Sequence, residues 1–90
     1  DTAGTVSEAA RALKNLGAKD IYVCATHALF SGPAVERLTN APITEVVVTD
    51  TINLSPDRRF PTLRVLSVGE LLAKAIRFTH ADQSVSVLFE

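Results

Sequence analysis

The first five residues of the chain are of the types that can hold a phosphate group. Asp1, Thr2, Ala3, Gly4 and Thr5 form a run of small, hydroxyl and acidic residues directly before a helical pattern. The first turn of a helix has backbone N–H groups without intrahelical partners, and these groups favour anions. Small polar residues are also the usual helix caps. The run therefore fits either a phosphate loop or an ordinary capped turn.

Other charged and imidazole side chains carry weaker signals. His27 follows an apolar run and could serve as an acid, a base or a metal ligand, but no second His or Cys stands at ligand spacing, so no metal site is assigned. His80 has the place of a charge that complements a helix C-terminus. Arg58 and Arg59 beside Asp57 could form an anion site, although a turn with solvated charges is the commoner arrangement.

No residue is assigned a catalytic role. Ser31, Ser84 and Ser86 have no His base and acid nearby in the sequence, so we assign no serine nucleophile. The single cysteine, Cys24, lies in an apolar run, where we expect a buried and inert thiol. One unpaired cysteine is typical of a reducing, cytoplasmic setting.

The composition limits the class of protein. The chain has 90 residues, 47% hydrophobic and 21% charged, which is typical of one small globular domain or part of one. A net charge of -1 offers no basic surface for nucleic acid. No apolar run approaches the roughly 20 residues of a membrane span. The chain contains no methionine, and we expect it to be a fragment of a longer protein.

Apolar runs alternate with helical patterns along the chain. Thr5 and Glu8 match a capping box, followed by a helical stripe that Gly17 ends. We expect strands at 21–26, 43–52 and 63–68, helices at 33–40 and after a second capping box at 67–70, and an edge or interface strand at 84–89. The first strand reads as central and buried on both faces.

This alternation predicts an α/β fold with a parallel sheet and right-handed crossovers. Ligands of such sheets bind at the carboxyl ends of the strands. The segments DTAGT, ATHALFS and TDTI each lie where a strand passes into a loop. We expect these three segments to line one crevice.

The order of the motifs resembles that of a known enzyme family. The motifs are DTAGTVSEAARALKNLGAK, ATHALFSGPAVERL, VVVTDTI, LRVLSVGELLAKAI and SVSVLF. Together they resemble the C-terminal portion of ribose-phosphate pyrophosphokinases, which have a type I phosphoribosyltransferase fold. The chain departs from many relatives at Asp50, where we would expect an asparagine.

The resemblance implies a function for two segments. Asp1, Thr2, Ala3, Gly4 and Thr5 would bind ribose 5-phosphate. Ser84, Ser86 and Phe89 would belong to an allosteric site for phosphate or ADP. The parent would transfer pyrophosphate from Mg-ATP to the C1 hydroxyl of ribose 5-phosphate, giving phosphoribosyl pyrophosphate for nucleotide biosynthesis.

The same resemblance implies what else the parent would need. The Mg²⁺ ligands, the catalytic loop and most of the ATP site would lie upstream of these residues, so the fragment alone is expected to be inactive. The domain would be the C-terminal part of a phosphoribosyltransferase-like domain, covering 1–90 and truncated at the sugar-phosphate loop. Homo-oligomers, hexamers in the family, are expected. A type I phosphoribosyltransferase and a non-catalytic regulatory paralogue stay open as alternatives.

Overall fold

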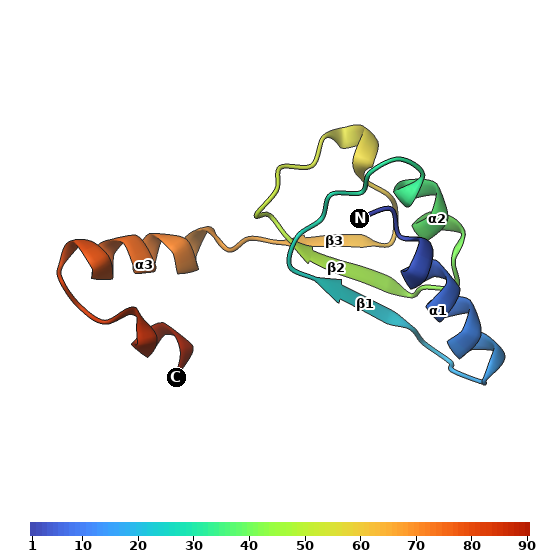
Figure 1. Cartoon of the computed structure of the whole chain (residues 1–90), viewed down its shortest axis with the longest axis horizontal. Helices are drawn as coiled ribbons and strands as arrows, with labels where there is room; N and C mark the ends of the chain where they lie inside the picture. The colour runs from blue at the N-terminus through green and yellow to red at the C-terminus, as the bar shows by residue number, and fades with distance from the viewer.

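Three short, mainly apolar runs form a parallel sheet in the computed structural model, which describes all 90 residues. The strands are β1 (Tyr22–Ala25), β2 (Glu45–Thr49) and β3 (Leu63–Leu66), and they lie in the order β1-β2-β3 (Figure 1). Val48 of the central strand pairs with Ala25 on one side and with Val65 on the other. The predicted parallel α/β architecture is confirmed.

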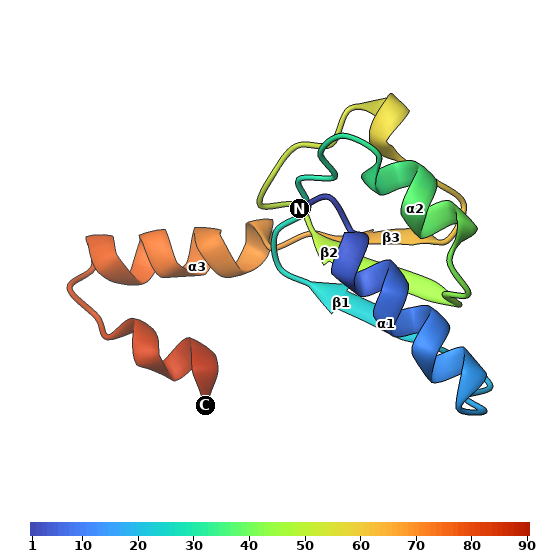
Figure 2. The same cartoon turned by 45° about the vertical axis from the view of Figure 1, so that its right-hand side comes forward.

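Two helices cover one face of this sheet. They are α1 (Gly4–Asn15) and α2 (Ala34–Asn40), which lie on the same side of the strands in both views (Figures 1 and 2). Strand side chains alternate between faces, so Val46 and Val48 both point toward these helices and are buried, in one core with Ala10 and Leu38. The core thus lies between the helix pair and the central strand.

The opposite face of the sheet carries no helix in either view (Figures 1 and 2). The prediction that the first strand is central and doubly buried is wrong, because β1 is an edge strand of this sheet and Tyr22 on it is 63% exposed. Cys24 is also exposed, contrary to the expected burial. An unbroken apolar run has apolar residues on both faces, but it does not show which faces the chain itself covers.

Both predicted capping boxes are wrong. The first helix begins at Gly4, its N-cap is Ala3, and no side chain caps it. The last helix, α3 (Gly69–His80), has Val68 as its N-cap, and the Ser67 hydroxyl accepts from the Gly69 N–H instead of reaching the residue expected of a capping box. Thr5 lies inside α1, one residue after its start, and Ser67 lies one residue before the N-cap of α3, so neither side chain occupies a capping position.

The chain leaves the sheet after β3. Helix α3 extends away from the strands, and the last turn folds back beside it (Figure 1). The expected strand at 84–89 is wrong: residues Val85–Phe89 form a 3₁₀ turn, whose start is capped by the Ser84 hydroxyl accepting from the Ser86 N–H. A β-strand needs a neighbouring strand for its hydrogen bonds, and no strand lies beside this segment.

None of the helices combines the length and the apolar character that a bilayer crossing requires.

Candidate functional site: a helix N-terminal loop at the strand ends

The loop before α1 is tied to the segment that follows β1. The backbone N–H of Ser31 donates to the carbonyl oxygen of Asp1 at 3.1 Å. Ser31 follows Phe30, which has a left-handed backbone with φ 51° and a buried ring. Two of the segments expected to share a crevice, DTAGT and ATHALFS, therefore meet.

The third segment joins them through hydroxyl and imidazole groups. Nδ1 of His27 lies 2.8 Å from Oγ1 of Thr51. Oγ1 of Thr49 donates to the carbonyl oxygen of Thr26 at 2.6 Å. These bonds connect the carboxyl end of β1 with that of β2, so the structure links TDTI to ATHALFS directly and to DTAGT through it.

The backbone of the N-terminal loop leaves donors free. Ala3 is left-handed, with φ 61° and ψ 16°, and its carbonyl oxygen accepts from the Ser7 N–H at 3.0 Å as the helix begins. The N–H groups of Gly4, Thr5 and Val6 donate no hydrogen bond within the chain. Unpaired N–H groups at the positive end of a helix dipole are a favourable surrounding for an anion.

The five loop residues line one shallow hollow. Its volume is ≈ 150 Å³, and its lining consists of Asp1, Thr2, Ala3, Gly4, Thr5 and Val6. A separate, mainly apolar cavity of ≈ 90 Å³ lies between the loop and the core. Both volumes are below the roughly 300 Å³ at which ligand pockets begin, so size does not decide between them. The hollow is the better candidate for a small phosphorylated ligand because the loop with the free N–H groups lines it, whereas the cavity is lined mainly by apolar side chains.

A neighbouring side chain, and not a left-handed backbone, restricts position 4 to a residue without a side chain. Its φ is not left-handed, and a Cβ built on it would lie 3.2 Å from Nη1 of Arg37. The same Nη1 donates to the carbonyl oxygen of Thr2 at 3.1 Å. Sequence reasoning missed Arg37, because nothing in the spacing of the α2 residues shows that one of them reaches a loop at the start of the chain.

Asp50 connects the end of β2 to the start of α3. The backbone N–H of Val68 donates to Oδ1 of Asp50 at 2.8 Å. This hydrogen bond, with a further one from the Ser67 hydroxyl, lowers the pKa of Asp50. The carboxylate at this position thus has a structural partner of its own and does not face the N-terminal hollow.

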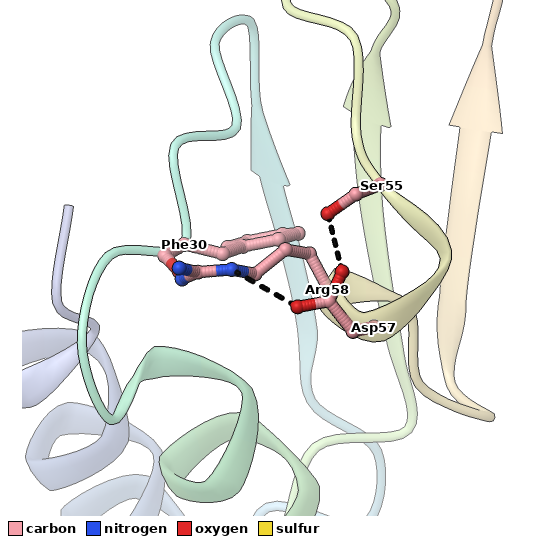
Figure 3. A network of polar contacts seen from close by, with 4 residues as sticks. All are labelled: Phe30, Ser55, Asp57 and Arg58. Atoms are coloured by element: carbon pink, nitrogen blue, oxygen red, sulfur yellow. Dashed lines mark hydrogen bonds and ion pairs between the residues drawn. The ribbon is translucent and has the colours of Figure 1, made fainter.

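In the charged turn at 57–59, Asp57 and Arg58 contact other residues of the chain (Figure 3), whereas Arg59 is solvated. Arg58, half-buried, donates from Nη1 to the carbonyl oxygen of Phe30, and its Nε lies 3.8 Å from Oδ2 of Asp57. The Ser55 hydroxyl donates to Asp57 at 2.5 Å, and this bond lowers the pKa of Asp57. Arg59 is exposed, and its side chain makes no hydrogen bond or ion pair. The Arg58 guanidinium is engaged with the chain itself and is not free for an anion.

The residues of the expected allosteric site lie at the other end of the molecule. Oγ of Ser84 and Oγ of Ser86 are 2.8 Å apart. The ring of Phe89 is 73% exposed. The tail lies beside α3, away from the N-terminal loop (Figure 1). The structure thus brings the two serines together and leaves the ring in solvent.

Metal-ligating groups do not gather anywhere in the chain. No group of three or more His, Cys, Asp or Glu side chains is arranged to hold a metal ion. His27 has a threonine hydroxyl as its hydrogen-bond partner, and His80 lies in the last turn of α3, where a positive charge complements the helix dipole. The residues present do not fit a magnesium site.

The fold and the loop define a class before any relative is considered. A parallel α/β sheet with a helix N-terminus and hydroxyl groups at its carboxyl edge is the architecture of domains that bind phosphorylated small molecules. The whole chain, residues 1–90, matches the model of the phosphoribosyl synthetase-associated domain. The chain belongs to this family.

Individual relatives agree with the family model. The chain is 58% identical over 89 residues to a ribose-phosphate pyrophosphokinase of Gloeobacter violaceus, covering 99% of this chain and 27% of the relative. It is 53% identical, over 99% of this chain and 28% of the relative, to that of Bacillus subtilis.

A solved structure agrees as well. The crystal structure of a phosphoribosylpyrophosphate synthetase from Mycobacterium smegmatis matches with a TM-score of 0.90 and 44% sequence identity, over 91% of this chain and 28% of that chain. The predicted family resemblance and the type of fold are confirmed. The chain spans less than a third of the length of these relatives.

Proposed function

We propose that this chain is part of a ribose-phosphate pyrophosphokinase and supplies its ribose 5-phosphate loop. The observation that carries the proposal is the identity of 58% across 99% of the chain with an enzyme of that name. The parent would transfer the β,γ-pyrophosphoryl group of ATP to the C1 hydroxyl of ribose 5-phosphate, with phosphoribosyl pyrophosphate and AMP as products. We further propose that residues 1–90 form the C-terminal part of one phosphoribosyltransferase-like domain.

The chemistry of the N-terminal hollow supports the acceptor role. Three backbone N–H groups without partners and the dipole of α1 favour the 5-phosphate. The hydroxyls of Thr2 and Thr5 add two donors beside them. The Asp1 carboxylate repels phosphate, so a ribose hydroxyl is its more suitable partner. Binding of this kind holds the acceptor in place for the transfer.

The metal and the nucleotide belong to other parts of the proposed parent. The magnesium ion of the reaction has no ligand set among these residues, so the contribution of this chain is confined to the acceptor and the tail. We expect the 90-residue chain alone to release no AMP.

The tail and α3 support a role in assembly and regulation. Leu72 and Ile76 of α3 are 54% and 71% exposed, which is unusual for large apolar side chains unless another surface covers them. We therefore propose that α3 packs against another copy of the protein in a homo-oligomer. From the resemblance to the family, we propose that this oligomer is a hexamer in the cytoplasm. The paired hydroxyls of Ser84 and Ser86, with the exposed ring of Phe89, would bind phosphate or ADP.

The direct test is an assay of the full-length protein that contains this chain. We expect AMP to form from ATP only when ribose 5-phosphate is present. Release of pyrophosphate from phosphoribosyl pyrophosphate and a nucleobase would instead identify a type I phosphoribosyltransferase. A full-length protein that has no activity by itself but changes the activity of an active synthetase when the two are mixed would be a regulatory paralogue.

A further inference from the structure

We infer that Arg37 is a positioning residue for the sugar-phosphate loop, holding the loop backbone from behind the hollow. The inference rests on the proposed function of that loop. Arg37 lies on α2, far from the loop in the sequence, and its Nη1 donates to the carbonyl oxygen of Thr2 at 3.1 Å. No other side chain of the chain donates to a backbone carbonyl of the loop.

The place of the guanidinium explains why it positions the loop and does not bind the ligand directly. Arg37 is absent from the lining of the hollow, which is made by the loop and Val6 alone. Nη1 instead lies against Gly4, 3.2 Å from where a Cβ would be. Arg37 therefore contacts the residue before and the residue after Ala3, whose left-handed backbone turns the chain into α1.

The conformation held in this way is one that alanine seldom adopts. A left-handed L-residue is strained and persists where its surroundings impose it. The hydrogen bond from Ser31 to Asp1 holds the loop on one side, and Arg37 holds it on the other. With both in place, the N–H groups of Gly4, Thr5 and Val6 are already aligned for an anion before one binds.

The charge of Arg37 is available to support an anion as well. Arg37 forms no ion pair, since the three in the chain involve Arg58, Arg64 and Lys74. A guanidinium has five N–H donors, and a single hydrogen bond accounts for one of them here. An unneutralised positive charge behind the loop lowers the energy of a phosphate in front of it, and a lysine would retain that charge while losing the fork geometry.

The test uses the full-length protein and compares three variants in steady-state kinetics. Arg37→Gln should raise the KM for ribose 5-phosphate at least fivefold while leaving kcat and the KM for ATP within twofold. Arg37→Lys should raise it less than Arg37→Gln does. Arg11→Gln, which removes an exposed positive charge on α1 without a side-chain contact, should leave all three values within twofold.

A second comparison separates positioning from general folding. Gly4→Ala moves the guanidinium away from the loop, so we expect it to raise the KM for ribose 5-phosphate in the wild type and much less in an Arg37→Gln background. Fully multiplicative effects would overturn the inference. So would an equal loss for both substrates in Arg37→Gln, because a folding defect is not selective.

The outcome also separates this inference from the proposed function. The binding of ribose 5-phosphate to the wild type is measured first, by titration calorimetry. Wild-type binding that Arg37→Gln leaves unchanged would overturn the role of Arg37 alone. Absence of wild-type binding would overturn both the loop assignment and the inference drawn from it.

Discussion

Ser31 donates its backbone N–H to the carbonyl oxygen of Asp1 at 3.1 Å, and through this bond the segment between β1 and α2 holds the loop that begins α1. Both segments depart from ordinary backbone geometry, since Ala3 and Phe30 are left-handed with φ of 61° and 51°. Strained residues of this kind cluster where a site needs a fixed shape. Two of the three left-handed non-glycine residues of the chain thus lie at the candidate site, and the third, Asp82, lies in the turn after α3.

The strain at Ala3 can be measured by removing it. Ala3→Gly should raise the free energy of unfolding by up to about 1 kcal/mol, because glycine adopts the left-handed region without the penalty that alanine has. Ala9→Gly, in the exposed interior of α1, is the matched control and should lower it by about 1 kcal/mol. The free energies of unfolding of both variants are measured by urea denaturation. Destabilisation by Ala3→Gly of the same size as by Ala9→Gly would show that the left-handed turn carries no strain.

Arg58 should contribute to stability while Arg59 should not. Arg58→Ala leaves the Phe30 carbonyl oxygen without its charged donor, and we expect a loss of roughly 1.5–3 kcal/mol, the usual contribution of a hydrogen bond to a charged group. Arg59→Ala should stay within about 0.5 kcal/mol, as surface changes without contacts do. The two are compared by thermal unfolding, and equal effects would contradict the hydrogen bond from Arg58 to the Phe30 carbonyl oxygen.

The lowered pKa of Asp50 predicts a pH dependence of stability. Because the carboxyl group has a lower pKa in the folded state than in the unfolded chain, its stabilising effect is complete above the ordinary value of 3.8 and is lost as the pH falls through the folded-state pKa. In Asp50→Asn the amide oxygen can still accept from the Val68 N–H, so this acid-dependent contribution should disappear while the fold is retained.

The measurement is the unfolding free energy of the wild type and of Asp50→Asn between pH 7 and pH 2. The difference between the two proteins should shrink on acidification. Asp20→Asn, at an exposed aspartate whose side chain makes no hydrogen bond, serves as the control. A difference that stays constant down to pH 2 would rule out a role for the Asp50 carboxylate in stability.

The tail can be tested without disturbing the loop. Ser84→Ala combined with Ser86→Ala in the full-length protein should weaken activation by phosphate or inhibition by ADP at least fivefold, because both hydroxyls at the 2.8 Å contact are removed. The KM for ribose 5-phosphate should stay within about twofold, a change of roughly 0.4 kcal/mol. The double Ser→Thr variant keeps both hydroxyls and is the control. An unaltered effector response with assembly intact would leave the tail as a structural turn.

The sequence alone determined the class of fold and the N-terminal loop. The mainly apolar runs around Val23, Val47 and Val65 and the helical stripes between them are local patterns, and local patterns are sufficient to predict strands, helices and a parallel sheet. The small polar run at Asp1–Thr5 could be recognised for the same reason, since it immediately precedes a helix. Its binding role stays a prediction.

Only the tertiary structure decided which faces are covered and what holds the loop. Cys24 and Tyr22 are exposed because no element packs on that face of β1, and the residues of 84–89 form a turn because no strand lies beside them. The contact of Arg37 with Thr2 joins segments that are distant in the chain. Such contacts depend on how helices and strands pack together in space, which the periodicity of one segment does not specify.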